Sequence, residues 1–112
     1  TLAQQDYNKA IELDPNDPHF YTNRGTSYLR IHQYAQALAD YSKAIELESE
    51  VFPMDDTDKG MLYAGRGFID LRMGKLDEAI NDLKTAINLN FQAADIYNNG
   101  SSRDRVGQFE AF

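Results

Sequence analysis

Few side chains in this chain of 112 residues have the chemistry or the spacing that covalent catalysis requires. The sequence contains no cysteine, no glycine-rich phosphate loop and no pair of histidines spaced for zinc. Its two histidines, His19 and His32, have no matched nucleophile. The neighbouring carboxylates of Asp77 and Glu78 begin an expected helix, where negative charge is stabilising in any case. We therefore predict no catalytic residues and do not expect an enzyme.

The acidic segment ESEVFPMDDTDK at 48–59 invites comparison with a calcium site. If Asp55 were the first ligand of an EF-hand-like loop, Lys59 would stand at the fifth ligand position and Arg66 at the closing glutamate. This pattern does not match, so we expect no metal and no cofactor. We expect instead an inserted, solvated acidic loop at 52–59, whose aspartates begin the next helix and complement its dipole.

Arginine has the distribution that most suggests recognition chemistry. All six arginines lie within 18–31, 60–73 and 94–106, although the chain is acidic, with a net charge of -7 and a pI near 4.6. An arginine side chain is a planar donor that suits carboxylates. The acidity opposes extensive nucleic-acid binding, which needs clustered cations. We therefore expect a protein or peptide partner, acidic where it meets the arginines, and no nucleic acid.

These residues are carried by a repeated unit. The segment DYNKAIEL at 6–13 recurs as DYSKAIEL at 40–47, which is 34 residues later, and as DLKTAINL at 82–89, which is 42 residues further on. A second element, YTNRGTSYL from Tyr21, recurs as YAGRGFIDL from Tyr63. Two kinds of segment therefore alternate, and eight extra residues occur once.

Both segments have the periodicity of amphipathic helices, and no strand is indicated. Asp17 followed by Pro18 is typical of a helix N-terminus, and Gly74 is typical of a left-handed residue after a helix end. His32 stands at the position of Gly74 in the preceding unit, and histidine tolerates that conformation better than most residues. We expect helices of about 12 to 14 residues joined by tight turns.

The pattern resembles the tetratricopeptide repeat family, in which a 34-residue unit folds as two antiparallel helices, A and B. The residues that carry the resemblance are Tyr21, Gly25, Tyr28, Ala37, Tyr41 and Ala44 in one unit and Tyr63, Gly67, Ala79, Leu83 and Ala86 in the next. Asp70 departs from the pattern at the second aromatic position of helix A, and Ser49 and Phe91 replace the closing proline. The resemblance implies an all-α fold, a right-handed α-solenoid of helix A and helix B hairpins.

Small residues in this pattern let helix backbones approach one another. Gly25 and Gly67 remove a side chain where helix A crosses helix B, and Tyr28 and Tyr41 fill the space between the helices. A generic helical bundle is the alternative, and three copies of D-x-x-x-A-I-x-L in phase argue against it. We expect one array, divided into the end of repeat 1 (1–17), repeat 2 (18–51), the inserted loop (52–59), repeat 3 (60–93) and a partial repeat 4 (94–112).

By resemblance, helix A lines a concave groove that holds a peptide segment of a partner protein, so we expect a protein-interaction scaffold. The groove-facing residues expected from the phase of the helices are His19, Thr22, Asn23, Thr26, Arg30, Ala64, Gly65, Phe68 and Arg72. Arg24 and Arg66 lie beside the packing glycines, and their stems could be buried instead. The carboxylate clamp of chaperone-binding repeats is not expected, because Met61 and Gly65 stand where its last lysine and arginine would be.

Two alternatives remain open at the level of the sequence. Neither end of the array has a polar capping helix, and the segment 94–106 is a poor helix former, so the chain could self-associate as a homo-oligomer. The array could also be the docking domain of a longer enzyme or regulator. The sequence contains no membrane-length apolar run and no signal peptide, and we expect a cytoplasmic protein that does not contact membranes.

Overall fold

The structure, a computed structural model, describes residues 2–50 and 53–101, with side chains described at 3–48 and 53–90. Over these residues the chain is helical and has no strand, as predicted. The helices are α1 (Leu2–Leu13), α2 (Pro18–Arg30), α3 (Tyr34–Glu50), α4 (Asp56–Arg72) and α5 (Leu76–Ser101). Residues 102–112, with Arg103, Arg105 and most of the expected partial repeat 4, lie outside the described part of the chain.

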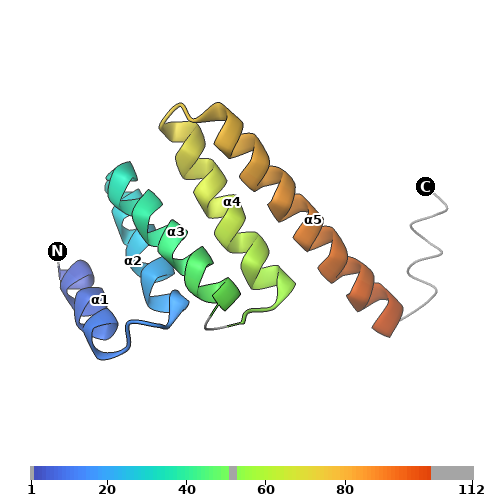
Figure 1. Cartoon of the computed structure of the whole chain (residues 1–112), viewed down its shortest axis with the longest axis horizontal. Coiled ribbons are helices and arrows are strands. Elements are labelled where there is room, and N and C mark those ends of the chain that lie inside the picture. Colours follow the sequence, from blue (N-terminus) through green and yellow to red (C-terminus); the bar gives the residue numbers. More distant parts are fainter. Residues whose placement is uncertain (1, 51–52, 102–112) are drawn as a thin grey trace.

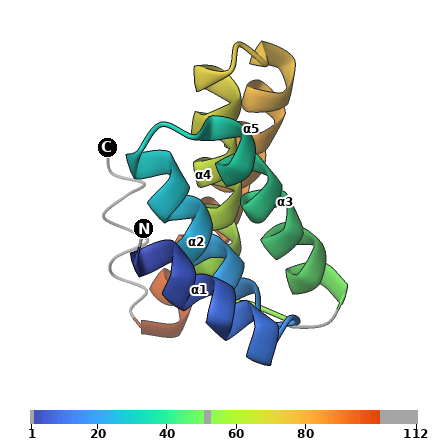
Figure 2. The ribbon, with the colours of Figure 1, turned by 90° about the vertical axis from the view of Figure 1, so that its left-hand side faces the viewer.

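Each helix packs against the next one in the sequence, from α1 to α5. The helices therefore stand in chain order across the molecule (Figure 1). Seen from the α1 end, α2 and α3 lie behind α1 and diverge from one another (Figure 2). The hairpin of α2 and α3 and the hairpin of α4 and α5 are the two complete helix A and helix B units of the prediction.

The helix ends follow the residues that the sequence indicated. The side chain of Asp17 caps α2 by accepting a hydrogen bond from the backbone N–H of His19, and Pro18 occupies the first turn. His32 and Gly74 both adopt left-handed backbone conformations, with φ of 61° and 76°, in the turns that reverse the chain inside each hairpin. The two turns are therefore equivalent, although one uses histidine and the other glycine.

Tyr41 of α3 occupies the centre of the core, with 6% of its surface exposed. A Cβ added at Gly25 of α2 would lie 2.9 Å from the Tyr41 ring, and a Cβ added at Gly65 of α4 would lie 2.5 Å from it. The two glycines therefore admit the tyrosine ring from two neighbouring repeats. Gly65 was expected in the groove, and this position is wrong, because its missing side chain makes room for Tyr41.

The second hairpin repeats this arrangement with smaller residues. A Cβ added at Gly67 would lie 2.9 Å from Cγ of Leu83, which replaces the tyrosine. Ala79 and Ala86 of α5 are both buried, as Ala37 and Ala44 are in α3. The predicted role of small residues in setting the distance between helices is confirmed.

The inserted loop is shorter than the predicted range of 52–59. Asp56 and Asp58 lie in the first turn of α4, whose N-cap is Asp55, and the Asp55 carboxylate accepts the backbone N–H of Asp58 at 2.8 Å. An ion pair of 3.2 Å between Glu48 and Lys59 joins the end of α3 to the start of α4. The extra residues therefore lengthen two helices to 17 residues each, beyond the 12 to 14 expected.

The boundary expected after residue 93 lies inside a helix. α5 runs for 26 residues to Ser101 without the turn that would separate repeat 3 from repeat 4. The stretch NFQAA at 90–94 contains neither proline nor glycine, and Phe91 stands where the family closes its unit with proline. Nothing in this stretch breaks the backbone hydrogen bonding, so the helix continues.

Candidate functional site

Two arginines that the sequence placed in the candidate recognition segments bind carboxylates within their own hairpins. Arg24 of α2 donates from Nε and Nη2 to the two oxygens of Asp40 in α3, at 2.8 and 2.7 Å. Arg66 of α4 makes the same two bonds to Asp82 of α5, both at 2.8 Å. Both aspartates are buried, at 4% and 6% exposure. These arginines therefore fasten helix A to helix B and are not free to bind a partner.

The sequence carried a signal for these pairs that the prediction missed. In both hairpins the arginine precedes its aspartate by 16 residues. Hydrogen bonding to the aspartate raises the pKa of each arginine, more than burial lowers it. The guanidinium of Arg24 also lies 5.8 Å from the ring centre of Tyr21 and 6.0 Å from that of Tyr28.

Asp70 breaks this symmetry, because it stands in α4 where Tyr28 stands in α2. Its side chain is 3% exposed, and its Oδ2 is buried without a hydrogen-bond partner among the described residues. Burial and hydrogen bonding to Asp82 raise the pKa of Asp70 to about 6. Burial also opposes ionisation of Asp82, but hydrogen bonds from Arg66 and Asp70 outweigh it and lower the pKa of Asp82. A protonated Asp70 is thus stabilised beside an ionised Asp82.

Three of the predicted groove residues lie together at the first hairpin. Asn23, Thr26 and Arg30 of α2 line a hollow of about 160 Å³ against Ala3 and Tyr7 of α1. Asn23 and Arg30 are exposed and Thr26 is half-buried. The hollow therefore offers an amide and a guanidinium beside a tyrosine.

The threonine hydroxyls of α2 are engaged within the fold. Thr22 Oγ1 donates to the carbonyl of Pro18 at 3.0 Å. Thr26 Oγ1 bonds the carbonyl of Thr22 at 2.9 Å and the Tyr41 hydroxyl at 2.8 Å. Thr26 thus supports the core tyrosine as well as lining the hollow.

The other predicted groove residues are distributed along α2 and α4. Phe68 is 39% exposed, and the Arg72 guanidinium lies 5.0 Å from the centre of its ring. Ala64 is half-buried on the same helix. His19 lies at the start of α2, where its Nδ1 is 2.8 Å from Asp17 Oδ1. The predicted site residues therefore fall into separate places. Asn23, Thr26 and Arg30 line the hollow at α2, Phe68 and Arg72 pack together on α4, and His19 lies at the start of α2.

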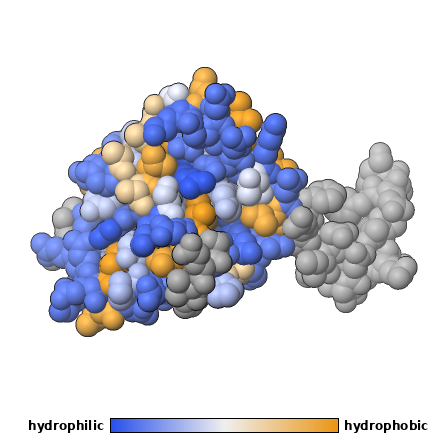
Figure 3. Space-filling model, in the orientation of Figure 1, coloured by the Kyte–Doolittle hydropathy of each residue, from blue (hydrophilic) through white to orange (hydrophobic). Residues whose placement is uncertain are grey.

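The visible surface is mostly polar. On the face shown in Figure 3, hydrophilic residues predominate and apolar residues form small separate groups.

Within the described part of the chain, no three histidine or acidic side chains are arranged to hold a metal ion. None of the described helices combines the length and apolar character needed to cross a membrane.

Comparisons with known proteins agree with the repeat pattern. Residues 6–39 and residues 62–93 each match the tetratricopeptide repeat family. Human serine/threonine-protein phosphatase 5 is 36% identical over 72% of this chain, which is 15% of the phosphatase. The small glutamine-rich tetratricopeptide repeat-containing protein 2 of Saccharomyces cerevisiae is 28% identical over 79% of this chain and 23% of its own length. The chain therefore spans less than a quarter of these relatives.

A solved structure supports the fold independently. The N-terminal domain of stress-induced protein-1 from C. elegans superposes with a TM-score of 0.54 and covers 94% of this chain and 74% of that chain, at 23% sequence identity. The phosphatase match covers only 15% of that protein, and the matched family models describe repeats, so the comparison assigns no phosphatase activity to this chain. With two repeats matched and the stacked hairpins in place, the chain belongs to the tetratricopeptide repeat family, whose fold is a protein-interaction module.

Proposed function

We propose that this array binds an extended, acidic segment of a partner protein in the groove lined by the A helices, α2 and α4. The observation that carries the proposal is the placement of Arg30 and Arg72, which are the last residues of α2 and α4 and are both exposed. Arg24 and Arg66 are paired with buried aspartates, so Arg30 and Arg72 are the A-helix guanidinium groups available to a partner's carboxylates.

The side chains around these two arginines suit a peptide. The exposed amide of Asn23 can hydrogen-bond a peptide backbone in the hollow that it shares with Arg30. Phe68, beneath Arg72, offers an apolar surface to one side chain of the peptide. Arg72 stacked on a ring loses less conformational freedom on binding than a free arginine would.

The test is to capture partners from the source cell with wild-type protein and with the double variant Arg30→Glu and Arg72→Glu. The affinity for a captured acidic segment should fall, and its dependence on salt should flatten, while the helical content stays unchanged. Glutamine variants of Arg30 and Arg72 are measured as well. They remove the charge without reversing it, and a cation at the C-terminal end of a helix also stabilises that helix.

A control variant makes the same change of charge away from the A helices, with Lys9→Glu in α1 and Lys84→Glu in α5. The control should retain binding if the groove is the site. Equal affinity of wild type and the Arg30 and Arg72 variant would rule this groove out.

A second candidate function, self-association, is favoured by an apolar stripe on α5. Its members stand at the repeat positions of Tyr34, Leu38, Tyr41 and Ile45 in α3, which belong to the hydrophobic core cluster or pack against it. The members of the α5 stripe are instead exposed by 37% to 66%: Leu76, Ile80, Leu83 and Ile87. Sedimentation velocity over a concentration series should show association that Ile80→Glu with Ile87→Glu removes and the exposed control Leu13→Glu leaves in place. A wild-type monomer at high concentration would exclude this function.

A docking role within a longer enzyme or regulator is a third possibility, favoured by the match to a short part of a phosphatase. We further propose that the protein works in the cytoplasm, which the absence of cysteine suits. Fractionation of the source cell with an antibody to the chain would show both the size of the full product and its compartment.

A further inference from the structure

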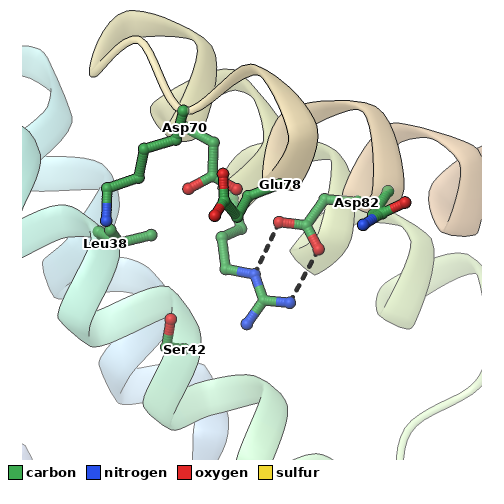
Figure 4. A pocket seen from close by; sticks show the side chains of 8 residues that line it. Leu38, Ser42, Asp70, Glu78 and Asp82 are labelled. Atoms are coloured by element: carbon green, nitrogen blue, oxygen red, sulfur yellow. Dashed lines mark hydrogen bonds and ion pairs between the residues drawn. The ribbon is translucent and has the colours of Figure 1, made fainter.

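A polar hollow lies between α3, α4 and α5. None of the proposed groove residues lines it. It has a volume of about 370 Å³ and opens to the surface. Figure 4 shows the carboxylates of Asp70, Glu78 and Asp82 on its α4 and α5 side, facing Leu38 and Ser42 of α3. Arg66, Lys75 and Asn81 complete the lining.

Two differences between the repeats account for this hollow. Asp70 takes the place of Tyr28, whose ring lies beside Arg24 in the first hairpin. Ser42 takes the place of Asn8, whose Oδ1 accepts a bond of 2.7 Å from Arg24 Nη1. No such bond joins Arg66 to Ser42 in the described structure. A smaller polar residue therefore replaces a larger one on both sides of the same arginine.

The hollow contains an acceptor that needs a donor. Asp70 is buried, and its Oδ2 has no partner among the described residues. The Arg66 guanidinium uses Nε and Nη2 for Asp82, as the dashed lines in Figure 4 show. Leaving a buried carboxylate oxygen without a donor is unfavourable, and a charged donor is the strongest remedy.

The charge and shape of the lining favour a cation. Asp70, Glu78 and Asp82 provide three carboxylates against the two cations Arg66 and Lys75, while α3 contributes only the uncharged Leu38 and Ser42. Leu38 gives one wall an apolar surface on which the methylene stem of a long side chain can lie.

We propose that this hollow is a second recognition site, which takes the ammonium or guanidinium group of a lysine or arginine side chain from a partner protein. The cation pairs with the carboxylate of Asp70, which lines the hollow, while Glu78 adds charge attraction and Leu38 contacts the stem. The site is independent of the groove, so Arg30 and Arg72 do not contribute to it.

The test is an NMR titration of the isotope-labelled full chain with N-acetyl-lysine amide and N-acetyl-arginine amide. N-acetyl-norleucine amide, which has the stem without the charge, is the control probe. The charged probes should shift the Asp70 carboxyl carbon and the Ser42 amide, and norleucine should not. Asp70→Asn should weaken binding about tenfold or more, since it removes a charge-assisted bond. Binding should also strengthen from pH 5 to pH 7 as Asp70 ionises.

Two further variants separate the possible outcomes. Asp70→Tyr restores the residue of the first hairpin and should abolish the response without loss of the fold. Lys75→Gln should leave binding intact or strengthen it, since Lys75 is a competing cation. Binding that survives Asp70→Asn unchanged would overturn the proposal, as would no binding to wild type. Binding only to Lys75→Gln would also overturn it, because the chain's own ammonium would then occupy the hollow.

Discussion

The ring of Tyr41 lies between two glycines that belong to different repeats, and its hydroxyl reaches Thr26 at 2.8 Å. One side chain therefore contributes to the packing inside a hairpin and to the packing between hairpins. The fit depends on two positions without a side chain, so the tyrosine cannot be enlarged and its loss cannot be filled by its neighbours.

Tyr41→Ala should lower the free energy of unfolding by roughly 3 to 5 kcal/mol, because it opens a cavity between α2, α3 and α4. Tyr41→Phe keeps the ring and loses the bond to Thr26, so it should cost only about 0.5 to 1.5 kcal/mol. Urea unfolding followed by circular dichroism measures both. A loss below about 1 kcal/mol for the alanine variant would show that the ring is not a packing centre.

Asp70 gives the protein a pH dependence of a definite sign. Its pKa is raised from 3.8 to about 6 in the folded state, so the folded protein holds this proton more tightly than the unfolded chain does. Its contribution to stability is complete below pH 4 and is lost as the pH rises toward 6. The size is about 2 to 3 kcal/mol. Asp82 acts in the opposite sense, because its pKa is lowered and its contribution is lost as the pH falls below 4.

Unfolding at pH 4, 5, 6 and 7 should therefore show wild type losing stability relative to Asp70→Asn across this range. The asparagine variant keeps the shape of the side chain without its titration. Because the pKa of Asp82 is lowered, Asp82 is ionised over most of this pH range, and the difference between the two curves reports the titration of Asp70. Parallel curves would mean that Asp70 titrates normally in the folded protein.

At the scale of the helices, the sequence specified where most elements begin but not how far three of them, α3, α4 and α5, run. Asp17, His32 and Gly74 could be recognised because N-caps and left-handed turns demand particular residue types. The length of α5 depends on the absence of a breaker at Phe91, and poor helix formers do not stop a helix that is already nucleated.

The candidate site was predicted only in part, for a related reason. Periodicity assigns a residue to a side of a helix but not to a neighbour, so Gly65 was placed in the groove although the Tyr41 ring fills its space. The pairing of Arg24 with Asp40 depends on how two helices are aligned, which periodicity within one helix does not show. The burial of Asp70 was likewise visible only as a departure from the aromatic pattern.

The contact between α3 and α4 can be tested by adding one methyl group. Gly65→Ala would place a Cβ 2.5 Å from the Tyr41 ring, so it should destabilise the protein by about 1 to 3 kcal/mol. In a Tyr41→Ala background the same change should become stabilising by about 0.5 to 1 kcal/mol, because alanine favours the helix once the ring is gone. Urea unfolding of the four proteins measures this reversal, and the same sign in both backgrounds would contradict the contact.

At the scale of the whole molecule, each helix contacts its sequence neighbours, so a change in one hairpin reaches the other mainly through α3 and α4. Arg24→Lys and Arg66→Lys each keep a positive charge but lose the geometry that makes two hydrogen bonds to the aspartate. Each substitution should lower the free energy of unfolding by about 1 kcal/mol. Their effects should add within about 0.5 kcal/mol in the double variant, since the two pairs share no partner.

A control for this additivity lies within one hairpin. Arg66→Lys and Asp82→Asn alter the two sides of a single pair, and their combined effect on unfolding should differ from the sum. A strong departure from additivity between Arg24 and Arg66 would show that the molecule does not behave as a linear stack.

Because Arg24 and Arg66 each bind an aspartate of their own hairpin, a duplicated hairpin would already contain the ion pair that joins its two helices. An array of this kind can lengthen by tandem duplication of its coding sequence without a simultaneous change in the older copies. A difference in the surroundings of one of these arginines, such as Asp70 and Ser42 around Arg66, can then be confined to one hairpin while the ion pair of the other stays in place.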